Sequence, residues 1–284
     1  MKLTCNLCSK NTHHELLTID KPDRFEEYMG VDVKNYERIW SECEHCGVAV
    51  NNMNSNSLEA IRKIGTGYSE ADNLHTVEQI EQRYNKIISL SPNNSDNVHR
   101  VKRVLNFFRD WYTKSKEIHL IDIGSGTGVF LSELHNKADE YTLHSTALDT
   151  DPLMAKHLKS LNQFKVVEDL FPYKNMRNNF DFIALNKVLE HIEKPHSLLN
   201  TISDHLNKDR GLFYLEVPCI TNVWLKPKDD NSLGSIHFNL YSLYGLNKLL
   251  KEADLMVLEN KRIIEPSGKV TICAFACHRT SFNA

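Results

Sequence analysis

Four of the seven cysteines form two pairs, each with the spacing C-x-x-C, and these residues could bind a metal ion. They are Cys5, Cys8, Cys43 and Cys46. Four thiolates suit tetrahedral Zn²⁺, and a shell of four protein ligands leaves no position for substrate, so a zinc ion here would be structural. His13, His14 or His45 could replace one thiolate. The rival interpretation is a redox pair, but redox pairs normally lie on a thioredoxin-like βαβ unit, which neither pair follows.

Three alternating glycines, Gly124, Gly126 and Gly128, follow an apolar run that ends at Ile123. A loop with glycines at these places can lie close beneath a ligand, because no Cβ atom blocks the approach. The dinucleotide fingerprint G-x-G-x-x-G would need a glycine where this sequence has Val129. At the carboxyl end of a strand the loop is well placed for a cofactor, and a plain strand-to-helix turn is the alternative.

The residues around the loop resemble motif I of class I S-adenosylmethionine (SAM) dependent methyltransferases, which reads roughly D-x-G-x-G-x-G. Asp122 occupies the acidic position of that motif. Asp149 ends the second predicted strand, about 20 residues after the loop, where the resemblance implies a carboxylate that accepts hydrogen bonds from both ribose hydroxyls. In isolation, Asp149 could instead cap the helix that begins near Pro152.

Two later segments extend the resemblance. Asp169, which Leu170 follows, lies where the family has an acidic residue near the adenine amino group, although Glu168 could take the same role. The stretch 179–195 looks like the family's fourth-strand motif, which implies that residues 186–188 line the methionine end of the cofactor. The cofactor-binding residues that the resemblance implies are Asp122, Gly124, Gly126, Gly128, Asp149, Asp169, Leu170, Asn186 and Val188.

Methyl transfer to an oxygen or carbon acceptor needs a general base, and histidine or glutamate is the usual choice near neutral pH. The candidates follow the fourth and fifth predicted strands, because ligands bind at the carboxyl ends of strands. They are Glu190 and His191 after the fourth strand, Glu216 at the end of the fifth strand, and His237 and Tyr241 after it. His237 is our first choice, with packing or helix capping as its alternative role, and His191 could instead pack beneath the cofactor. Glu216 could alternatively hold a metal ion or a sugar hydroxyl.

The elements that must position these residues alternate between strand and helix after residue 117, which predicts a parallel sheet with helices on both faces. The predicted strands span 118–123, 144–149, 164–167, 180–185, 211–217, 256–264 and 269–277, and the predicted helices span 128–137, 152–161, 195–207 and 242–253. The turn at 265–268 is too short for a crossover helix, so the last strand should run antiparallel to its neighbour. With the resemblance, this predicts an α/β fold with a Rossmann-like, seven-stranded class I methyltransferase sheet.

A helical segment is predicted before this sheet, over residues 58–117. Apolar residues recur at spacings of three and four over 77–88 and again over 98–111. The second of these stretches and the residues after it carry a basic group, which consists of Arg100, Lys102, Arg103, Arg109, Lys114 and Lys116. We interpret this group as the solvated face of a helix or as a clamp on a substrate diphosphate. A further segment, 219–236, is predicted to be a loop that covers the substrate.

The overall composition is that of an ordinary globular protein, with 41% hydrophobic residues and a net charge of -3. These values give no general attraction to nucleic acid or to an anionic membrane. No stretch approaches the ~20 apolar residues of a membrane span, and the N-terminus lacks the apolar core of a signal peptide. We therefore expect a cytoplasmic protein.

The expected domain organisation has three parts. A zinc-binding knuckle covers residues 1–55, a helical linker or cap covers 56–117, and a SAM-binding methyltransferase domain covers 118–284. A zinc knuckle before such a domain resembles bacterial deoxysugar C-methyltransferases, which act on nucleotide-linked sugars. Members of that group usually carry a further large C-terminal domain, for which the residues after the last predicted strand are too few.

The same arrangement also resembles a type of ribosomal RNA guanine methyltransferase with an N-terminal zinc finger. Residues 1–50 contain six Lys and Arg against nine Asp and Glu, and this acidic balance disfavours binding to RNA phosphates. We therefore expect a small polar substrate, with a sugar derivative first. An RNA methyltransferase, or a non-catalytic SAM-binding protein that docks a partner, remains the alternative.

Overall fold

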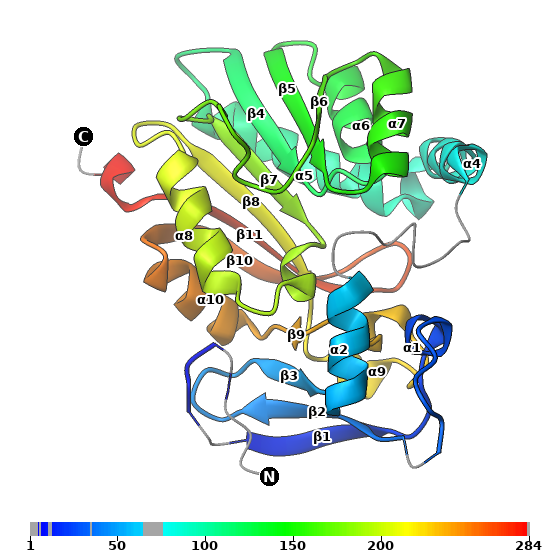
Figure 1. Cartoon of the computed structure of the whole chain (residues 1–284). Helices are drawn as coiled ribbons and strands as arrows, with labels where there is room; N and C mark the ends of the chain where they lie inside the picture. The colour runs from blue at the N-terminus through cyan, green and yellow to red at the C-terminus, as the bar shows by residue number, and fades with distance from the viewer. Residues whose placement is uncertain (1–4, 6, 11–12, 35, 65–75, 283–284) are drawn as a thin grey trace.

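Seven strands form the larger of two sheets in the structure, a computed structural model that describes residues 5, 7–10, 13–34, 36–64 and 76–282 (Figure 1). Their order across the sheet is β10-β11-β8-β7-β4-β5-β6. The five strands from β8 to β6 pair in parallel, and β11 runs antiparallel to both β8 and β10. The strands are β4 Glu117–Ile123, β5 Thr142–Asp149, β6 Lys165–Glu168, β7 Phe182–Asn186, β8 Leu212–Pro218, β10 Leu255–Ile264 and β11 Val270–His278.

All seven strands predicted from the sequence are present, and each end lies within two residues of its predicted position. The antiparallel last strand is also confirmed. Its cause is the short turn that the sequence indicated, in which the amide of Glu265 donates to the carbonyl of Lys269. The Rossmann-like sheet therefore follows from the pattern of apolar runs and turns.

Helices cover both faces of this sheet (Figure 1). Side chains of α5, α6 and α7 join one core cluster with Leu120, whereas side chains of α8 and α10 join a second cluster with Ile121, the next residue of β4. Successive side chains of a strand point to opposite faces, so each face of β4 is buried beneath one helical layer. The helices are α5 Asp96–Trp111, α6 Val129–Lys137, α7 Pro152–Leu161, α8 Pro195–His205 and α10 Leu243–Glu252. No described helix is both long and apolar enough to cross a membrane.

The smaller sheet contains the N-terminal part of the chain and one short strand from much later in the sequence. Its order is β1-β2-β3-β9, and all its pairs are antiparallel. The strands are β1 His13–Ile19, β2 Arg38–Cys43, β3 Ala49–Asn52 and β9 Asn239–Leu240. Because β9 follows β8 in the chain, hydrogen bonds to β3 attach the N-terminal sheet to the segment that carries His237. We refer to β1, β2, β3 and the four cysteines as the N-terminal module.

The described part of the chain also contains the helices α1 Arg24–Tyr28, α2 Ser55–Ile64, α4 Val77–Ile88 and the short α9 Asn222–Leu225. The helix predicted at 77–88 is confirmed, and the one predicted at 98–111 begins two residues earlier. Asn54 caps α2, since its Oδ1 accepts a hydrogen bond from the amide of Ser57. The part of the predicted helical segment between residues 65 and 75 lies outside the described residues.

Candidate functional site

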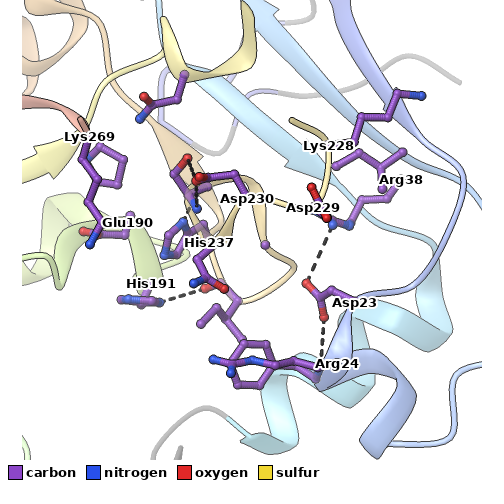
Figure 2. A pocket seen from close by; sticks show the side chains of 18 of the residues that line it. Asp23, Arg24, Arg38, Glu190, His191, Lys228, Asp229, Asp230, His237 and Lys269 are labelled. Atoms are coloured by element: carbon purple, nitrogen blue, oxygen red, sulfur yellow. Dashed lines mark hydrogen bonds and ion pairs between the residues drawn. The ribbon is translucent and has the colours of Figure 1, made fainter. Parts of the chain in front are cut away.

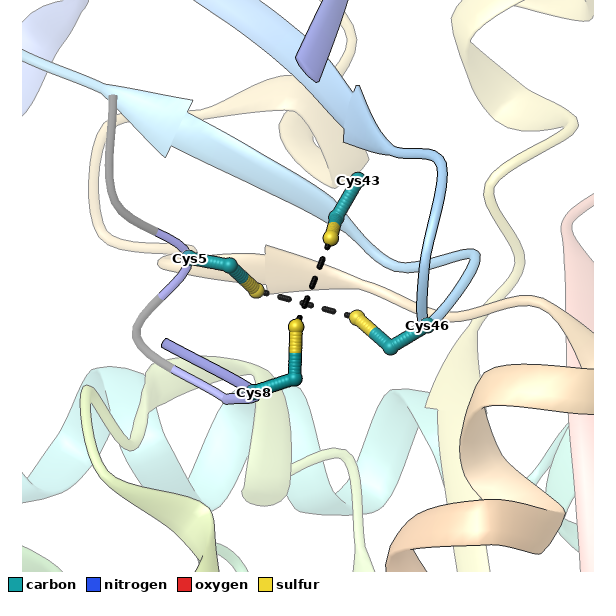
Figure 3. Close-up of side chains that lie close together, drawn as sticks. All are labelled: Cys5, Cys8, Cys43 and Cys46. Atoms are coloured by element: carbon teal, nitrogen blue, oxygen red, sulfur yellow. Dashed lines mark hydrogen bonds between the residues drawn. The ribbon is translucent and has the colours of Figure 1, made fainter. Parts of the chain in front are cut away.

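The four cysteines of the two C-x-x-C pairs converge in the N-terminal module (Figure 3). One potential ligand sulfur from each lies within 4.8 Å of the others. The Sγ atoms of Cys5 and Cys46 are 3.7 Å apart, and those of Cys8 and Cys43 are 3.5 Å apart. Four sulfurs bound to one ion at about 2.3 Å in a tetrahedron lie about 3.8 Å from one another. The cluster can therefore hold a tetrahedral metal ion without rearrangement of the backbone.

The glycine loop lies between the carboxyl end of β4 and the start of α6, as the sequence predicts. Gly126 has a φ of +53°, and no atom lies within 4 Å of the position that a Cβ atom would take. At Gly124, by contrast, a Cβ atom would lie 2.5 Å from Cγ2 of Val188. Gly124 therefore allows the loop to pack on the segment after β7, and Gly126 presents bare backbone to open space.

Two carboxylates flank this loop. Asp149, at the end of β5, accepts hydrogen bonds from the amides of Gly126 (2.7 Å) and Asp151 (3.0 Å), and burial raises its pKa. Asp122, at the end of β4, is buried, which raises its pKa to about 7. The Nδ2 of Asn186, at the end of β7, donates to Asp122 over 3.2 Å. Because β4 lies between β5 and β7, the three residues share one edge of the sheet.

The two residues implied near the adenine lie at the outermost strand of the same edge. Asp169 and Leu170 follow β6, and both are exposed. The carboxylate of Asp169 accepts a hydrogen bond from the amide of Leu170, which is 59% exposed. An exposed leucine beside an exposed carboxylate leaves a surface that a planar ring can cover.

A cavity of about 690 Å³ lies next to this edge (Figure 2). Its wall comes from five parts of the chain: 19–25 with Arg38, Arg83 of α4, the segment after β7, the loop after β8, and the start of β11. Seven Lys and Arg side chains line it against five Asp and Glu side chains. They are Lys21, Arg24, Arg38, Arg83, Lys187, Lys228 and Lys269, with Asp20, Asp23, Glu190, Asp229 and Asp230. The excess of positive charge favours a ligand that carries negative charge.

Three of the five candidate bases, Glu190, His191 and His237, line this cavity, and the ring centroids of the two histidines are 4.6 Å apart. Nδ1 of His191 lies 3.0 Å from the carbonyl oxygen of Ile236, and Nδ1 of His237 lies 2.9 Å from that of Ser232. Burial lowers the pKa of His191 to about 4 and that of His237 to about 3, so both rings are neutral at pH 7. A carbonyl oxygen can only accept, so each neutral ring carries its proton on Nδ1 and its lone pair on Nε2.

Glu190 and Lys187 lie beside these histidines. Glu190 is buried, which raises its pKa to about 7, and its Oε2 has no hydrogen-bond partner among the described residues. Lys187 is half-buried, with a lowered pKa caused by that burial, and its Nζ donates to the hydroxyl of Thr271. Lys187 belongs to the stretch 186–188 that the resemblance places at the methionine end of the cofactor, but its contact with Thr271 of β11 could not be predicted, because the two residues are 84 positions apart.

The other two candidate bases have surroundings that do not suit catalysis. Glu216 is buried at the end of β8, where Arg100 and Arg103 bind its two oxygens over 2.7 and 2.6 Å and Tyr214 donates to it. Burial alone would raise its pKa, but Arg100 and Lys187 hold the pKa of Glu216 well below its usual range. A carboxylate that is saturated in this way is a poor proton acceptor.

Tyr241 is also buried, and its hydroxyl donates to the carbonyl of Leu189 over 3.2 Å. Burial raises the pKa of Tyr241 well above its ordinary value. The bond instead holds the short 3-10 helix η2, Leu189–His191, against the segment that carries His237. A second bond, from the amide of Phe238 to the carbonyl of Glu190 over 2.7 Å, does the same.

The basic group over 100–116 divides in the structure: Lys102, Arg109, Lys114 and Lys116 are exposed, as a solvated face requires, whereas Arg100 and Arg103 are not. Arg100 and Arg103 are neither a solvated face nor free for a diphosphate, because Glu216 and Glu265 bind them. Lys116 is exposed and pairs with Glu140. The cationic groups of the cavity come from other segments, among them the loop predicted to cover the substrate, which contributes Lys228.

Hydrogen bonds from the N-terminal part of the chain hold residues 233–237, the segment that carries His237, in place. The sequence did not predict this role. Nη1 of Arg38 donates to the carbonyl of Leu233 over 2.7 Å, and Nδ2 of Asn51 donates to the carbonyl of His237 over 2.8 Å. Asp23 accepts hydrogen bonds from the amide (2.5 Å) and hydroxyl (2.8 Å) of Ser235. No local signal could have revealed these contacts, because they join residues about 200 positions apart.

Comparisons with solved structures show the same fold. A SAM-dependent methyltransferase from Clostridium acetobutylicum is 14% identical, with a TM-score of 0.52, over 71% of this chain and 98% of that one. The 1,6-didemethyltoxoflavin-N1-methyltransferase of Burkholderia thailandensis is also 14% identical, with a TM-score of 0.51, over 87% of this chain and 96% of that one. The plantazolicin methyltransferase BpumL is 12% identical, with a TM-score of 0.55, over 78% and 99%.

The search of curated proteins gave no match. A family model described as a methyltransferase domain matches residues 94–260, which is more than half of the chain and includes the glycine loop, the four strand ends and both histidines of the cavity. The seven-stranded sheet with one antiparallel strand agrees with the Rossmann-like class I methyltransferase fold. The chain belongs to the methyltransferase domain family.

Proposed function

We propose that the chain is a SAM-dependent methyltransferase that acts on a small polar molecule, with a nucleotide-linked or glycan-bound sugar as the first substrate class to test. The observation that carries this proposal is the cavity beside the carboxyl edge of the sheet, which two neutral imidazoles line. An imidazole lone pair beside the acceptor is what methylation of a hydroxyl or of an acidic carbon requires.

The proposed cofactor site is the glycine loop with the strand ends beside it. Asp149 would accept hydrogen bonds from the ribose hydroxyls, and the bare backbone at Gly126 would lie against the cofactor. Asp122 would lie toward the methionine end, and Asp169 and Leu170 toward the adenine. SAM supplies an electrophilic methyl group when bound, so the protein's part is to align the acceptor with that methyl group and exclude water.

The proposed acceptor site is the cavity. His237 would accept the proton of the acceptor at Nε2, because its Nδ1 already donates to Ser232, and His191 is the second candidate. The exposed guanidinium groups of Arg24 and Arg83 suit a phosphate, which arginine can bind through two parallel hydrogen bonds. A nucleotide-linked sugar has such phosphates, and this supports it over a neutral substrate.

We propose that the four cysteines bind one structural Zn²⁺. The sulfur separations fit a tetrahedral ion, and four thiolates would close the shell, so the ion would take no part in methyl transfer. Its role would be to stabilise the N-terminal module, which has little apolar core of its own. We retain the proposed organisation of a zinc-binding element over 1–55, a helical linker over 56–117 and a methyltransferase domain over 118–284.

Titration calorimetry with SAM, and with its demethylated product S-adenosylhomocysteine, tests the proposal on the full chain. We expect both to bind at micromolar concentration. Transfer of a labelled methyl group from SAM to a panel of nucleotide-linked sugars, glycans and RNA then tests the substrate class. If neither cofactor form binds, the chain is not an enzyme of this kind. If RNA alone is methylated, the substrate class is wrong.

A further inference from the structure

Three side chains on the wall of the cavity have the composition of a metal site. They are Glu190, His191 and His237, and one potential ligand atom from each lies within 4.8 Å of the others (Figure 2). Glu190 and His191 come from η2, and His237 comes from the segment after β8. Hydrogen bonds from Tyr241 and Phe238 hold these two segments together, so the backbone fixes the cluster.

The hydrogen bonds of the two histidines are those of metal ligands. In protein metal sites, a ligating imidazole almost always donates its other ring N–H to a backbone carbonyl or a carboxylate. Here Nδ1 of His191 donates to Ile236 and Nδ1 of His237 donates to Ser232. These hydrogen bonds at Nδ1 fix the orientation and the tautomer of each ring, so Nε2 is the atom that can bind an ion.

The carboxylate gives an independent indication of a bound cation. Glu190 is 1% exposed, and its Oε2 has no hydrogen-bond partner among the described residues. A buried carboxylate oxygen without a donor is costly, and a cation would remove that cost. The nearby ammonium of Lys187 donates to Thr271, and no ion pair within 4.0 Å joins it to Glu190 in the described part of the chain.

We infer that Glu190, His191 and His237 bind a divalent transition-metal ion, such as Zn²⁺, Mn²⁺ or Fe²⁺, on the wall of the acceptor cavity. Two imidazoles and one carboxylate suit these borderline ions better than Mg²⁺ or Ca²⁺, which prefer oxygen ligands. Bonds of about 2.0–2.2 Å to a tetrahedral ion place the donors about 3.3–3.6 Å from one another, so rotation of side chains whose ligand atoms already lie within 4.8 Å of one another would close the site.

The ion would keep open positions toward the cavity, because the protein supplies only three ligands. A substrate oxygen could occupy one of them, where the ion would lower the pKa of a hydroxyl or neutralise a phosphate. This role rests on the proposed function, whereas binding of the ion does not. In the loaded protein the ion, and not the lone pair of His237, would activate the acceptor.

A second cluster on the molecule provides a matched control. Glu117, His119 and His144 also bring potential ligand atoms within 4.8 Å of one another, but two of these residues are exposed and the rings of the histidines stack on each other. The carboxylate of this cluster, Glu117, is exposed, whereas that of Glu190 is buried. We expect it to bind metal ions only weakly.

Titration with Co²⁺ of the full chain loaded with one equivalent of Zn²⁺, which the four cysteines would take, tests the inference without SAM or substrate. We expect one further equivalent of Co²⁺ to bind, with ligand-field absorption but without the sulfur-to-cobalt charge-transfer band that the four cysteines would produce. Glu190→Gln and His237→Gln should weaken this binding about 100-fold or more, and His144→Gln should leave it unchanged. The half-buried His191 allows a third variant, His191→Gln, if a buried substitution disturbs folding, which circular dichroism and zinc content would report.

Absence of a further equivalent, or its loss in His144→Gln but not in His237→Gln, would overturn the inference. Because the titration contains no cofactor, failure of SAM to bind would leave this result intact. The two proposals can therefore fail separately.

Discussion

The proposed cofactor edge, which is the carboxyl edge of the large sheet with the glycine loop, and the proposed acceptor cavity lie side by side, but the chain builds them in different ways. The cofactor edge consists of strand ends, where Asp122, Asp149 and Asn186 follow directly from β4, β5 and β7. The cavity combines five segments between residues 19 and 271, and hydrogen bonds from Arg38 and Asn51 of the N-terminal module hold the segment that carries His237. One site is therefore local to a single sheet, and the other depends on how two sheets meet.

This difference predicts that damage to one site can spare the other. The proposed cofactor edge depends on the seven-stranded sheet, which has one core cluster of its own and shares a second with the N-terminal module. The cavity depends in addition on the N-terminal module, whose strands are short. Perturbations of the module should therefore affect the acceptor and leave the cofactor largely unaffected.

Removal of the proposed zinc ion is the strongest test of this separation, and it should have the largest effect. Structural zinc contributes about 10 kcal/mol or more to the folding of small zinc modules, so a chelator should unfold the module. We expect methyl transfer to be lost while the dissociation constant of SAM changes by no more than about threefold, since no cysteine lies at the cofactor edge. Calorimetry with SAM before and after chelation measures this.

Cys43→Ser should reproduce the effect of the chelator, and Cys277→Ser, in β11, should not. A parallel loss of SAM affinity in Cys43→Ser would show that the two sites are not separable.

Glu216→Gln should have the next largest effect, on stability and not on either site. Removing one partner of a buried ion pair leaves uncompensated charge, here on Arg100 and Arg103, and typically costs about 3–5 kcal/mol. Urea unfolding at pH 7 measures the free energy of unfolding. If the variant is as stable as the wild type but inactive, Glu216 acts in catalysis after all.

The same ion pair predicts a pH dependence of known sign. The pKa of Glu216 is lowered in the folded protein, from about 4.3 in an unfolded chain. Its contribution is therefore complete above that unfolded value and is lost as the pH falls through the lower folded value. The stability difference between wild type and Glu216→Gln should be constant from pH 6 to pH 8 and should shrink in acid.

Asp149→Ala should weaken SAM binding about 100-fold, because two hydrogen bonds to a charged acceptor would be lost at about 1.5 kcal/mol or more each. Asp169→Ala removes an exposed carboxylate from the same edge and should cost less than about tenfold. Calorimetry with SAM compares the two variants. Equal losses would mean that the ribose is not bound at the end of β5.

The sequence predicted the carboxyl edge of the large sheet better than the cavity, because the edge is local to one sheet and the cavity joins distant segments. The seven strands and the glycine loop repeat local patterns of apolar residues and turns, and the structure contains all of them. The strands of the N-terminal module were missed, because residues of β2 are buried on both sides and show no alternation. Glu216 was a candidate base because it ends the fifth strand. Its ion pairs with Arg100 and Arg103 could not be predicted, because these residues precede it by more than 100 positions.

The smallest expected effect concerns the charge of the acceptor. Arg24 is exposed at the cavity, so its contact with a substrate phosphate would be worth about 1 kcal/mol. Arg24→Ala should therefore raise KM for an anionic acceptor about three- to tenfold and leave kcat and SAM affinity unchanged. Arg109→Ala, on the exposed face of α5, is the control and should change neither KM nor kcat. Because salt screens exposed charges, the difference between the two variants should shrink at high ionic strength. An unchanged KM in Arg24→Ala at low salt would indicate that the positive charge of the cavity does not select the acceptor, and a neutral sugar would become the better candidate.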